Sequence, residues 1–139
     1  MTRVLVVDDD RSIGEVIQAS LARQNCETVL ALDGYSGIRA FDSSEFDLAI
    51  VDIFLPSISG LEMIGRIRQR TTTMPILAMS GFRFRGFMNP QRDFLHVAAT
   101  LGATFCLPKP FSPQQLMAAL AAAFGRPFLT VVQQDSNGS

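Results

Sequence analysis

The sequence lacks an excess of charge of either sign. Twelve Lys and Arg residues stand against thirteen Asp and Glu residues, so the formal charge of the 139-residue chain is −1. A protein that binds nucleic acid through bulk charge needs a large positive excess, which excludes that class. Charged residues make up only 18% of the chain, below the roughly 25% of typical soluble domains. This predicts some apolar surface that is left for a protein partner.

Cysteines and long apolar runs are also scarce. Cys26 and Cys106 are the two cysteines, and their separation matches no metal-ligand spacing. No segment approaches the roughly 18 consecutive apolar residues that cross a bilayer. The apolar start of the chain meets aspartates too soon to be a signal peptide. These absences predict a cytoplasmic protein without membrane insertion.

Short apolar segments are present instead, and they alternate with segments of helical period. Hydrophobic residues make up 47% of the chain, and the apolar segments lie at 4–7, 28–31, 48–51, 76–79 and 105–107. Continuous short runs are typical of strands that are buried on both faces, and segment 28–31 is the weakest, as expected near an edge. The predicted fold class is therefore α/β: a flavodoxin-like, doubly wound, five-stranded parallel sheet of order 2-1-3-4-5 with helices on both faces.

Helical stripes and caps fill the segments between these strands. Two of the predicted apolar stripes consist of Ile13, Val16, Ile17 and Leu21, and of Phe94, Leu95, Ala98 and Leu101. The last helix is expected to begin after Ser112, with Gln115 completing a capping box, and to end at Gly125. The domain is predicted to span residues 1–126, with a tail over 127–139.

Polar residues follow the predicted strands where each one ends. Asp8, Asp9 and Asp10 follow the first strand, and Asp52, Ser80 and Lys109 follow the third, fourth and fifth. Aspartates after strands are also common as turn formers and helix caps, which accounts well for Asp10. In a doubly wound sheet, however, ligands bind beyond the carboxyl ends of the strands. We therefore expect these groups to form one site.

The chemistry of that site follows from its charges. Two carboxylates about 4 Å apart repel by about 4 kcal/mol at an effective dielectric constant of 20, so one must hold a proton or a cation must neutralise them. An all-oxygen set of ligands suits Mg²⁺ better than zinc. Lys109 supplies a second positive charge and Ser80 a hydroxyl donor. Together the residues predict a phosphoryl-binding site that contains a carboxylate.

The motifs that carry these residues resemble a known family. They are Val6-Val7-Asp8-Asp9, Asp52-Ile53-Phe54-Leu55-Pro56 with Gly60, Ser80-Gly81, and Lys109-Pro110-Phe111. In this order and spacing they resemble the response-regulator receiver domain of two-component signalling, over about Val4 to Phe124.

The resemblance implies specific roles. Asp52 would be the phosphoacceptor, taking its phosphoryl group from a histidine of a sensor kinase or of a phosphotransfer protein. Asp8, Asp9, Asp52 and the backbone carbonyl of Phe54 would hold Mg²⁺. Lys109 would pair with the phosphoryl oxygens and precede a cis bond to Pro110, and Ser80 would swing inward to report phosphorylation.

It also implies what the domain does with the phosphoryl group. The protein would not be an enzyme beyond its own aspartyl phosphorylation and dephosphorylation. Its output would be the binding of a downstream protein, or of a second copy, through the fourth helix, fifth strand and fifth helix. We expect either a stand-alone regulator or a fragment of a longer one.

Three positions depart from the family pattern. Cys106 stands where a switching aromatic is usual, and strand alternation places the neighbouring Phe105 on the other face. The segment after Ser80 is longer than usual, with the excess at Phe82–Pro90. It is interpreted as a loop packed over the fourth helix or as a partner-docking surface. Its interleaved arginines and phenylalanines would also suit a nucleic-acid patch, which the near-zero net charge disfavours. Phe54 and Phe82 would exclude attacking water, which predicts a long-lived phosphoryl-aspartate.

Two other functions are compatible with the same residues. The Asp8-Asp9-Asp10 run also resembles the haloacid-dehalogenase phosphohydrolases, in which the aspartate of the first strand, here Asp8, would attack. Those enzymes need an acidic pair near the fourth strand, where this sequence has Ser80-Gly81. They also usually need a cap domain, and the chain is too short to hold one. A receiver-like interaction module that does not accept phosphate is the second alternative.

Overall fold

The predicted sheet is confirmed in every strand. The computed structural model describes residues 2–81 and 90–125, with side chains over 2–81 and 96–125. Its strands are β1 (Thr2–Val7), β2 (Cys26–Ala31), β3 (Leu48–Asp52), β4 (Ile76–Ser80) and β5 (Phe105–Pro108). All are parallel and follow the order β2-β1-β3-β4-β5, so the weakest apolar segment lies in the edge strand β2.

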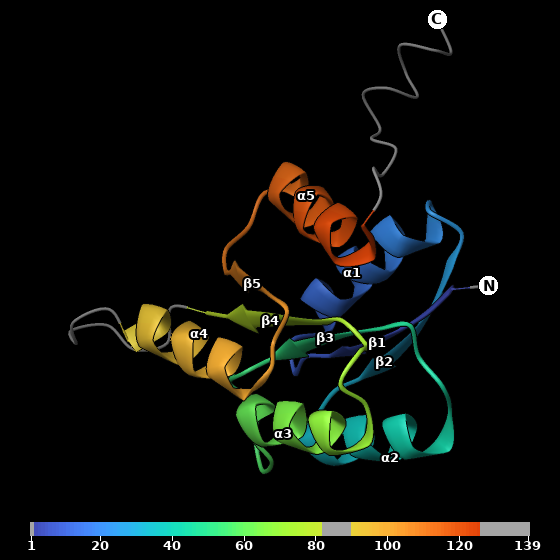
Figure 1. The fold of residues 1–139 in the computed structure, drawn as a ribbon. Coiled ribbons are helices and arrows are strands. Elements are labelled where there is room, and N and C mark those ends of the chain that lie inside the picture. The colour runs from blue at the N-terminus through green and yellow to red at the C-terminus, as the bar shows by residue number, and fades with distance from the viewer. Residues whose placement is uncertain (1, 82–89, 126–139) are drawn as a thin grey trace, which may run out of the picture.

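Five helices cover the two faces of the sheet (Figure 1). Helices α1 (Arg11–Ala22) and α5 (Pro113–Phe124) pack on one face, and α2 (Gly34–Ser43), α3 (Gly60–Arg70) and α4 (Pro90–Leu101) on the other. Alternate residues of β1 therefore enter two separate cores, with Val4 and Val6 beneath α1 and α5, and Leu5 and Val7 beneath α2 and α3. Burial on both faces explains why the strands are continuous apolar runs.

The predicted helix caps are present. Asp10 accepts hydrogen bonds from the backbone N–H groups of Ser12 at 2.9 Å and of Ile13 at 3.4 Å, so it is the N-cap of α1. Ser112 and Gln115 form the capping box of α5. Gly125 ends that helix in the left-handed conformation at φ 67°. The predicted domain boundary at residue 126, the tail, and residues 82–89 of the excess segment Phe82–Pro90 lie outside the described residues.

Two residues of the predicted apolar stripes are exposed and do not belong to the core. Val16 exposes 55% of its surface and Leu101 exposes 42%. Helix α1 faces the sheet with Gly14 instead, where a Cβ would lie 2.5 Å from the Leu30 side chain. This close approach turns Val16 away from the core. Helix α4 covers the edge strand β5, so its last turn has less sheet to pack against.

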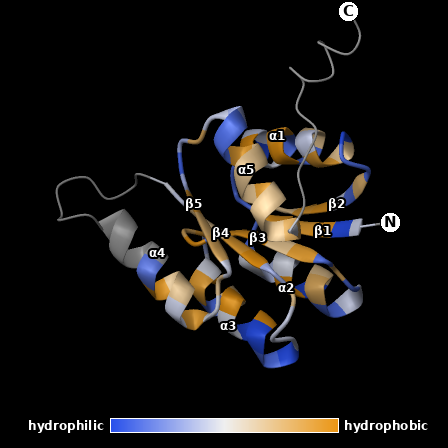
Figure 2. Cartoon of the chain, turned by 45° about the horizontal axis from the view of Figure 1, so that its top comes forward, coloured by the Kyte–Doolittle hydropathy of each residue, from blue (hydrophilic) through white to orange (hydrophobic). Residues whose placement is uncertain are grey.

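The hydropathy of the chain follows this layering. Hydrophobic colour runs through the central strands, whereas the helices alternate between hydrophobic and hydrophilic segments (Figure 2). Within the described part of the chain, no helix combines the length and hydropathy that a membrane crossing requires.

Candidate functional site

The four predicted groups lie together at the carboxyl ends of the strands. Asp8 follows β1, Asp52 and Ser80 are the last residues of β3 and β4, and Lys109 follows β5. Because β3 lies between β1 and β4, the chain folds these distant positions onto one edge of the sheet. Each of the four residues exposes 9% or less of its surface.

Lys109 joins the two buried carboxylates. Its Nζ donates to Asp8 Oδ2 at 2.6 Å and to Asp52 Oδ2 at 2.9 Å. The other oxygen of each carboxylate accepts a backbone N–H from two residues further on: Asp10 N lies 2.9 Å from Asp8 Oδ1, and Phe54 N lies 2.9 Å from Asp52 Oδ1. The two aspartates thus make the same kinds of contact, and these contacts alone do not distinguish their roles.

A third carboxylate completes the cluster. Carboxylate oxygens of Asp8, Asp9 and Asp52, hereafter the acidic cluster, lie within 4.8 Å of one another, and Asp9 is exposed. This confirms the prediction that the carboxylates meet. The two buried carboxylates of the cluster, Asp8 and Asp52, share the single ammonium group of Lys109. The all-oxygen donor set of the cluster fits a hard divalent cation.

The electrostatics of the pair follow from burial. Desolvation raises the pKa of Asp8, and the hydrogen bond from Lys109 only partly offsets this effect. Desolvation acts to lower the pKa of Lys109, but its hydrogen bonds and Coulombic attraction to Asp8 and Asp52 outweigh it and raise that pKa. Lys109 is therefore charged at neutral pH, whereas ionisation of Asp8 has a cost that a bound cation would offset.

Backbone contacts hold the site residues in place. Lys109 N donates to Ser80 O at 2.6 Å, which fixes the end of β5 beside β4. The bond between Lys109 and Pro110 is cis, as the resemblance implied.

Gly60 supports the site through its backbone, a role that its motif did not predict. Its N–H donates to Ile53 O at 3.2 Å. A Cβ at Gly60 would collide with Asp52 O and Ile53 Cα, so only glycine allows the start of α3 to lie against the end of β3. The glycine eight residues after Asp52 was the available signal, but the sequence did not show the close approach.

Strand β5 places Cys106 and Phe105 on opposite faces, as predicted. Phe105 packs against the core beneath α1 and α5, whereas Cys106 pairs in register with Ala78, which belongs to the other core. Cys106 is exposed, and partial burial of its thiol raises the pKa of that group. Phe82, which is predicted to exclude attacking water, lies outside the described residues.

Comparison with known proteins agrees with this geometry. A family model described as the response regulator receiver domain matches residues 4–121. The alkaline phosphatase synthesis transcriptional regulatory protein PhoP of Bacillus subtilis is 30% identical over 125 residues, which are 89% of this chain and 49% of PhoP. The response regulator ArlR of Staphylococcus epidermidis is 32% identical over 127 residues, 91% of this chain and 54% of ArlR. The chain thus spans about half the length of these relatives.

Solved structures show the same fold. A response regulator receiver domain protein from Clostridium thermocellum is 26% identical with a TM-score of 0.77, covering 90% of this chain and 95% of that one. A putative response regulator from Chloroflexus aurantiacus is 28% identical with a TM-score of 0.77, covering 90% and 98%.

These matches and the acidic cluster beside Lys109 define a phospho-accepting receiver and not a conventional enzyme. The chain belongs to the response regulator receiver domain family of two-component systems, which implies a cognate histidine kinase.

Proposed function

We propose that Asp52 accepts a phosphoryl group from a histidine of a sensor kinase or of a phosphotransfer protein, and that Mg²⁺ is required. The observation that supports this most strongly is the position of Asp52. It ends β3, between the strands that carry Asp8 and Ser80, and its carboxylate lies 2.9 Å from Lys109 Nζ. An incoming phosphoryl group would therefore meet cationic and hydroxyl groups on neighbouring strand ends.

The proposed transfer is a single displacement at phosphorus. A carboxylate oxygen of Asp52 forms the new P–O bond while the P–N bond of the phosphohistidine breaks and its electron pair stays on the imidazole. Phosphoryl transfer needs mainly alignment and neutralisation of charge. Lys109 supplies a positive charge, and the Ser80 hydroxyl is the proposed donor to a phosphoryl oxygen.

The acidic cluster is the proposed metal site. Asp8, Asp9 and Asp52 would hold Mg²⁺ together with the backbone carbonyl of Phe54. When bound, the ion would neutralise the carboxylates and the phosphoryl oxygens. The hydrogen bond from Phe54 N to Asp52 Oδ1 already keeps residue 54 beside the acceptor.

The proposed output surface is formed by α4, β5 and α5. Phosphorylation would change its affinity for a downstream protein or a second copy. Cys106 is exposed on β5, where the family usually has an aromatic, so another side chain or the backbone of the loop after β4 would carry the signal. The proposed receiver spans residues 1–126. Within it, Phe54 is proposed to prolong the life of the phosphoryl-aspartate by excluding water.

Intact-mass measurement after incubation with acetyl phosphate and MgCl₂ tests the acceptor. We expect one added phosphoryl group on the wild-type chain and none on Asp52→Asn or in the presence of EDTA. Asp42→Asn is the matched control, because Asp42 lies on α2, away from the cluster, and pairs with Arg70 at 2.8 Å. That variant should be phosphorylated like the wild type.

The same experiment distinguishes the two alternatives. Because Asp8 makes the same kinds of contact as Asp52, its variant Asp8→Asn belongs in the series. A label that survives Asp52→Asn but disappears in Asp8→Asn would favour attack by Asp8. A chain that takes no label under any condition would be an interaction module, and the proposal would be wrong.

A further inference from the structure

Gly65 is the one glycine in the described helices that no described contact explains. A Cβ at Gly14, Gly34, Gly37 or Gly60 would meet other atoms of the chain at less than 3.0 Å. A Cβ at Gly65 would meet no described atom within 4 Å, although the residue lies in the middle of α3. Glycine destabilises a helix interior relative to alanine. A glycine at such a position is useful where another backbone approaches closely.

Gly65 lines an open groove between α3 and α4. The groove has a volume of about 490 Å³ and is lined by Leu61, Glu62, Gly65, Arg66, Gln69 and Leu101; we call it the α3–α4 groove. Leu101 exposes 42% of its surface, and Val97, one turn earlier on α4, exposes as much. The groove is thus lined by two leucines and three polar or charged side chains, and Gly65 adds no side chain to this lining.

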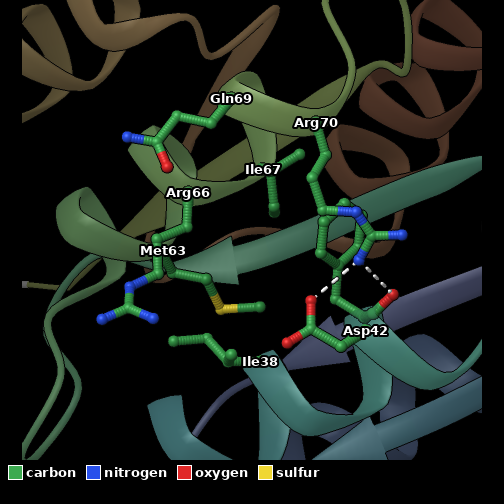
Figure 3. Close-up of a pocket in the computed structure, with 8 residues that line it drawn as sticks. Ile38, Asp42, Met63, Arg66, Ile67, Gln69 and Arg70 are labelled. Carbon is green, nitrogen blue, oxygen red and sulfur yellow. Dashed lines mark hydrogen bonds and ion pairs between the residues drawn. The ribbon is translucent and has the colours of Figure 1, made fainter.

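A second groove, on the α2 side of α3, is smaller and is closed by contacts within the chain. Its volume is about 150 Å³. Arg70 bridges it, donating to Asp42 Oδ1 at 2.8 Å and to Phe41 O at 3.0 Å. Arg66 and Gln69 line both grooves and extend away from the Arg70–Asp42 pair (Figure 3). These two residues therefore form an exposed ridge beside the α3–α4 groove, which we call the α3 ridge.

We propose that the α3–α4 groove binds the α3 ridge of a second copy of this chain, with the two α3 helices antiparallel across Gly65. In helix packing, a ridge of side chains on one helix fits into a groove beside a second helix. A two-fold axis between the copies lets each one supply a ridge to its partner and a groove for its partner's ridge. The missing Cβ of Gly65 allows the two backbones to approach at the axis.

The charges on α3 are self-complementary in this arrangement. Glu62 and Arg66 stand on either side of Gly65, and an antiparallel pairing centred there places Glu62 of one copy about 3 Å along the helix axis from Arg66 of the other. Within one chain, Glu62 Oε1 and Arg66 Nη2 are 4.0 Å apart and both side chains are about half exposed. This loose pair is free to exchange for two pairs between copies. A formal charge of −1 does not oppose association.

Sedimentation velocity of the full chain over a concentration series tests the proposal. We expect the wild type to shift from monomer to dimer. Gly65→Leu should weaken dimerisation at least tenfold, because its side chain fills the groove, while its thermal stability stays equal to or above that of the wild type. The fold should tolerate the change, since nothing described contacts that position.

Charge reversal provides the specific readout. Glu62→Arg and Arg66→Glu should each weaken the dimer, and the double variant should restore it. Glu45→Arg, the same change of charge at an exposed position away from α3, is the control and should leave dimerisation unchanged. Phosphorylation by acetyl phosphate should be unaffected by Gly65→Leu, so this test is separate from that of the acceptor.

Three results would overturn the proposal. One is a chain that stays monomeric at every concentration. Another is a dimer that Gly65→Leu does not weaken, which would place the contact elsewhere, for example on the α4–β5–α5 surface. The third is a double charge reversal that fails to recover what each single reversal loses.

Discussion

Two basic side chains hold segments of the chain together at opposite ends of the strands, Lys109 at the carboxyl ends (the carboxyl edge of the sheet) and Arg68 at the amino ends (the amino edge). The groups that these two side chains contact differ in charge. At the carboxyl edge, Lys109 Nζ contacts the carboxylates of Asp8 and Asp52. At the amino edge, the acceptors that Arg68 meets among the described residues are neutral: Gly102 O at 2.9 Å, Met74 O at 2.7 Å, Thr71 O at 3.2 Å and Thr104 Oγ1 at 3.3 Å.

The difference separates a reactive site from a structural one. The carbonyls around Arg68 carry no net charge, so this edge has no need for a further cation, and burial lowers the pKa of Arg68. At the carboxyl edge, two buried carboxylates, those of Asp8 and Asp52, share the one ammonium group of Lys109, so a divalent ion can stabilise them further. Function in this fold is therefore expected where buried charge is left incompletely balanced.

The largest effect is expected at Lys109. In the absence of metal, Lys109→Met should lower the free energy of unfolding by about 3–5 kcal/mol, because it leaves two buried carboxylates without their cation. Added Mg²⁺ should recover much of that loss. Urea unfolding with and without MgCl₂ measures both quantities. A loss that Mg²⁺ does not reduce would mean that the cluster does not bind the ion.

Arg68→Met is the corresponding change at the amino ends of the strands. It should lower the free energy of unfolding by about 1–3 kcal/mol, because partly buried carbonyls lose their donor. The same urea titration should show no difference between the variant and the wild type in their response to Mg²⁺. If Mg²⁺ compensated for this variant as well, the contrast between the two edges would disappear.

Two glycines provide a matched pair of backbone tests. Gly102 has φ 120° and a Cβ there would lie 2.7 Å from Arg68 Cγ, whereas a Cβ at Gly60 would collide with Asp52 O. Replacing either by alanine should lower the free energy of unfolding by about 1–3 kcal/mol. Only Gly60→Ala should also slow phosphorylation by acetyl phosphate, by up to about 100-fold, because it displaces the acceptor.

Equal phosphorylation rates in the two folded glycine variants would contradict the positioning role of Gly60. The temperature is chosen so that circular dichroism shows both variants to be folded. A matched loss of activity would then reflect general destabilisation.

The smallest effect is a pH dependence at Asp8. Its pKa is raised above the usual 3.8 by burial, so the folded state holds this proton at a pH where the unfolded state has lost it. Metal-free stability should therefore fall, relative to Asp8→Asn, as pH rises from 3.8 through the folded pKa. Thermal melts of both proteins over that range measure the difference. Parallel curves would contradict the predicted cost of ionising Asp8.

The strand order and the meeting of Asp8, Asp9 and Asp52 could be predicted because short apolar runs and the residues after them specify a parallel sheet and its edge. The contacts of Gly60 and Arg68 could not, because they depend on the distance between segments far apart in sequence. The exposure of Val16 and Leu101 could not be predicted either, because a helical stripe shows which residues share a face but not how much of that face the sheet covers.

Asp8 and Asp52 illustrate the limit at the site itself. Each accepts a backbone N–H from the second residue after it and the ammonium group of Lys109. Their contacts do not distinguish them, and only the family motif assigned the acceptor role to Asp52. The choice between these two carboxylates therefore needs chemistry.

The most direct measurement is residue-level mass spectrometry of the wild-type chain after phosphorylation by acetyl phosphate in the presence of Mg²⁺. We predict that the phosphoryl group lies on Asp52 and on no other residue. A phosphoryl group on Asp8, or an unmodified protein, would contradict the assignment of the acceptor.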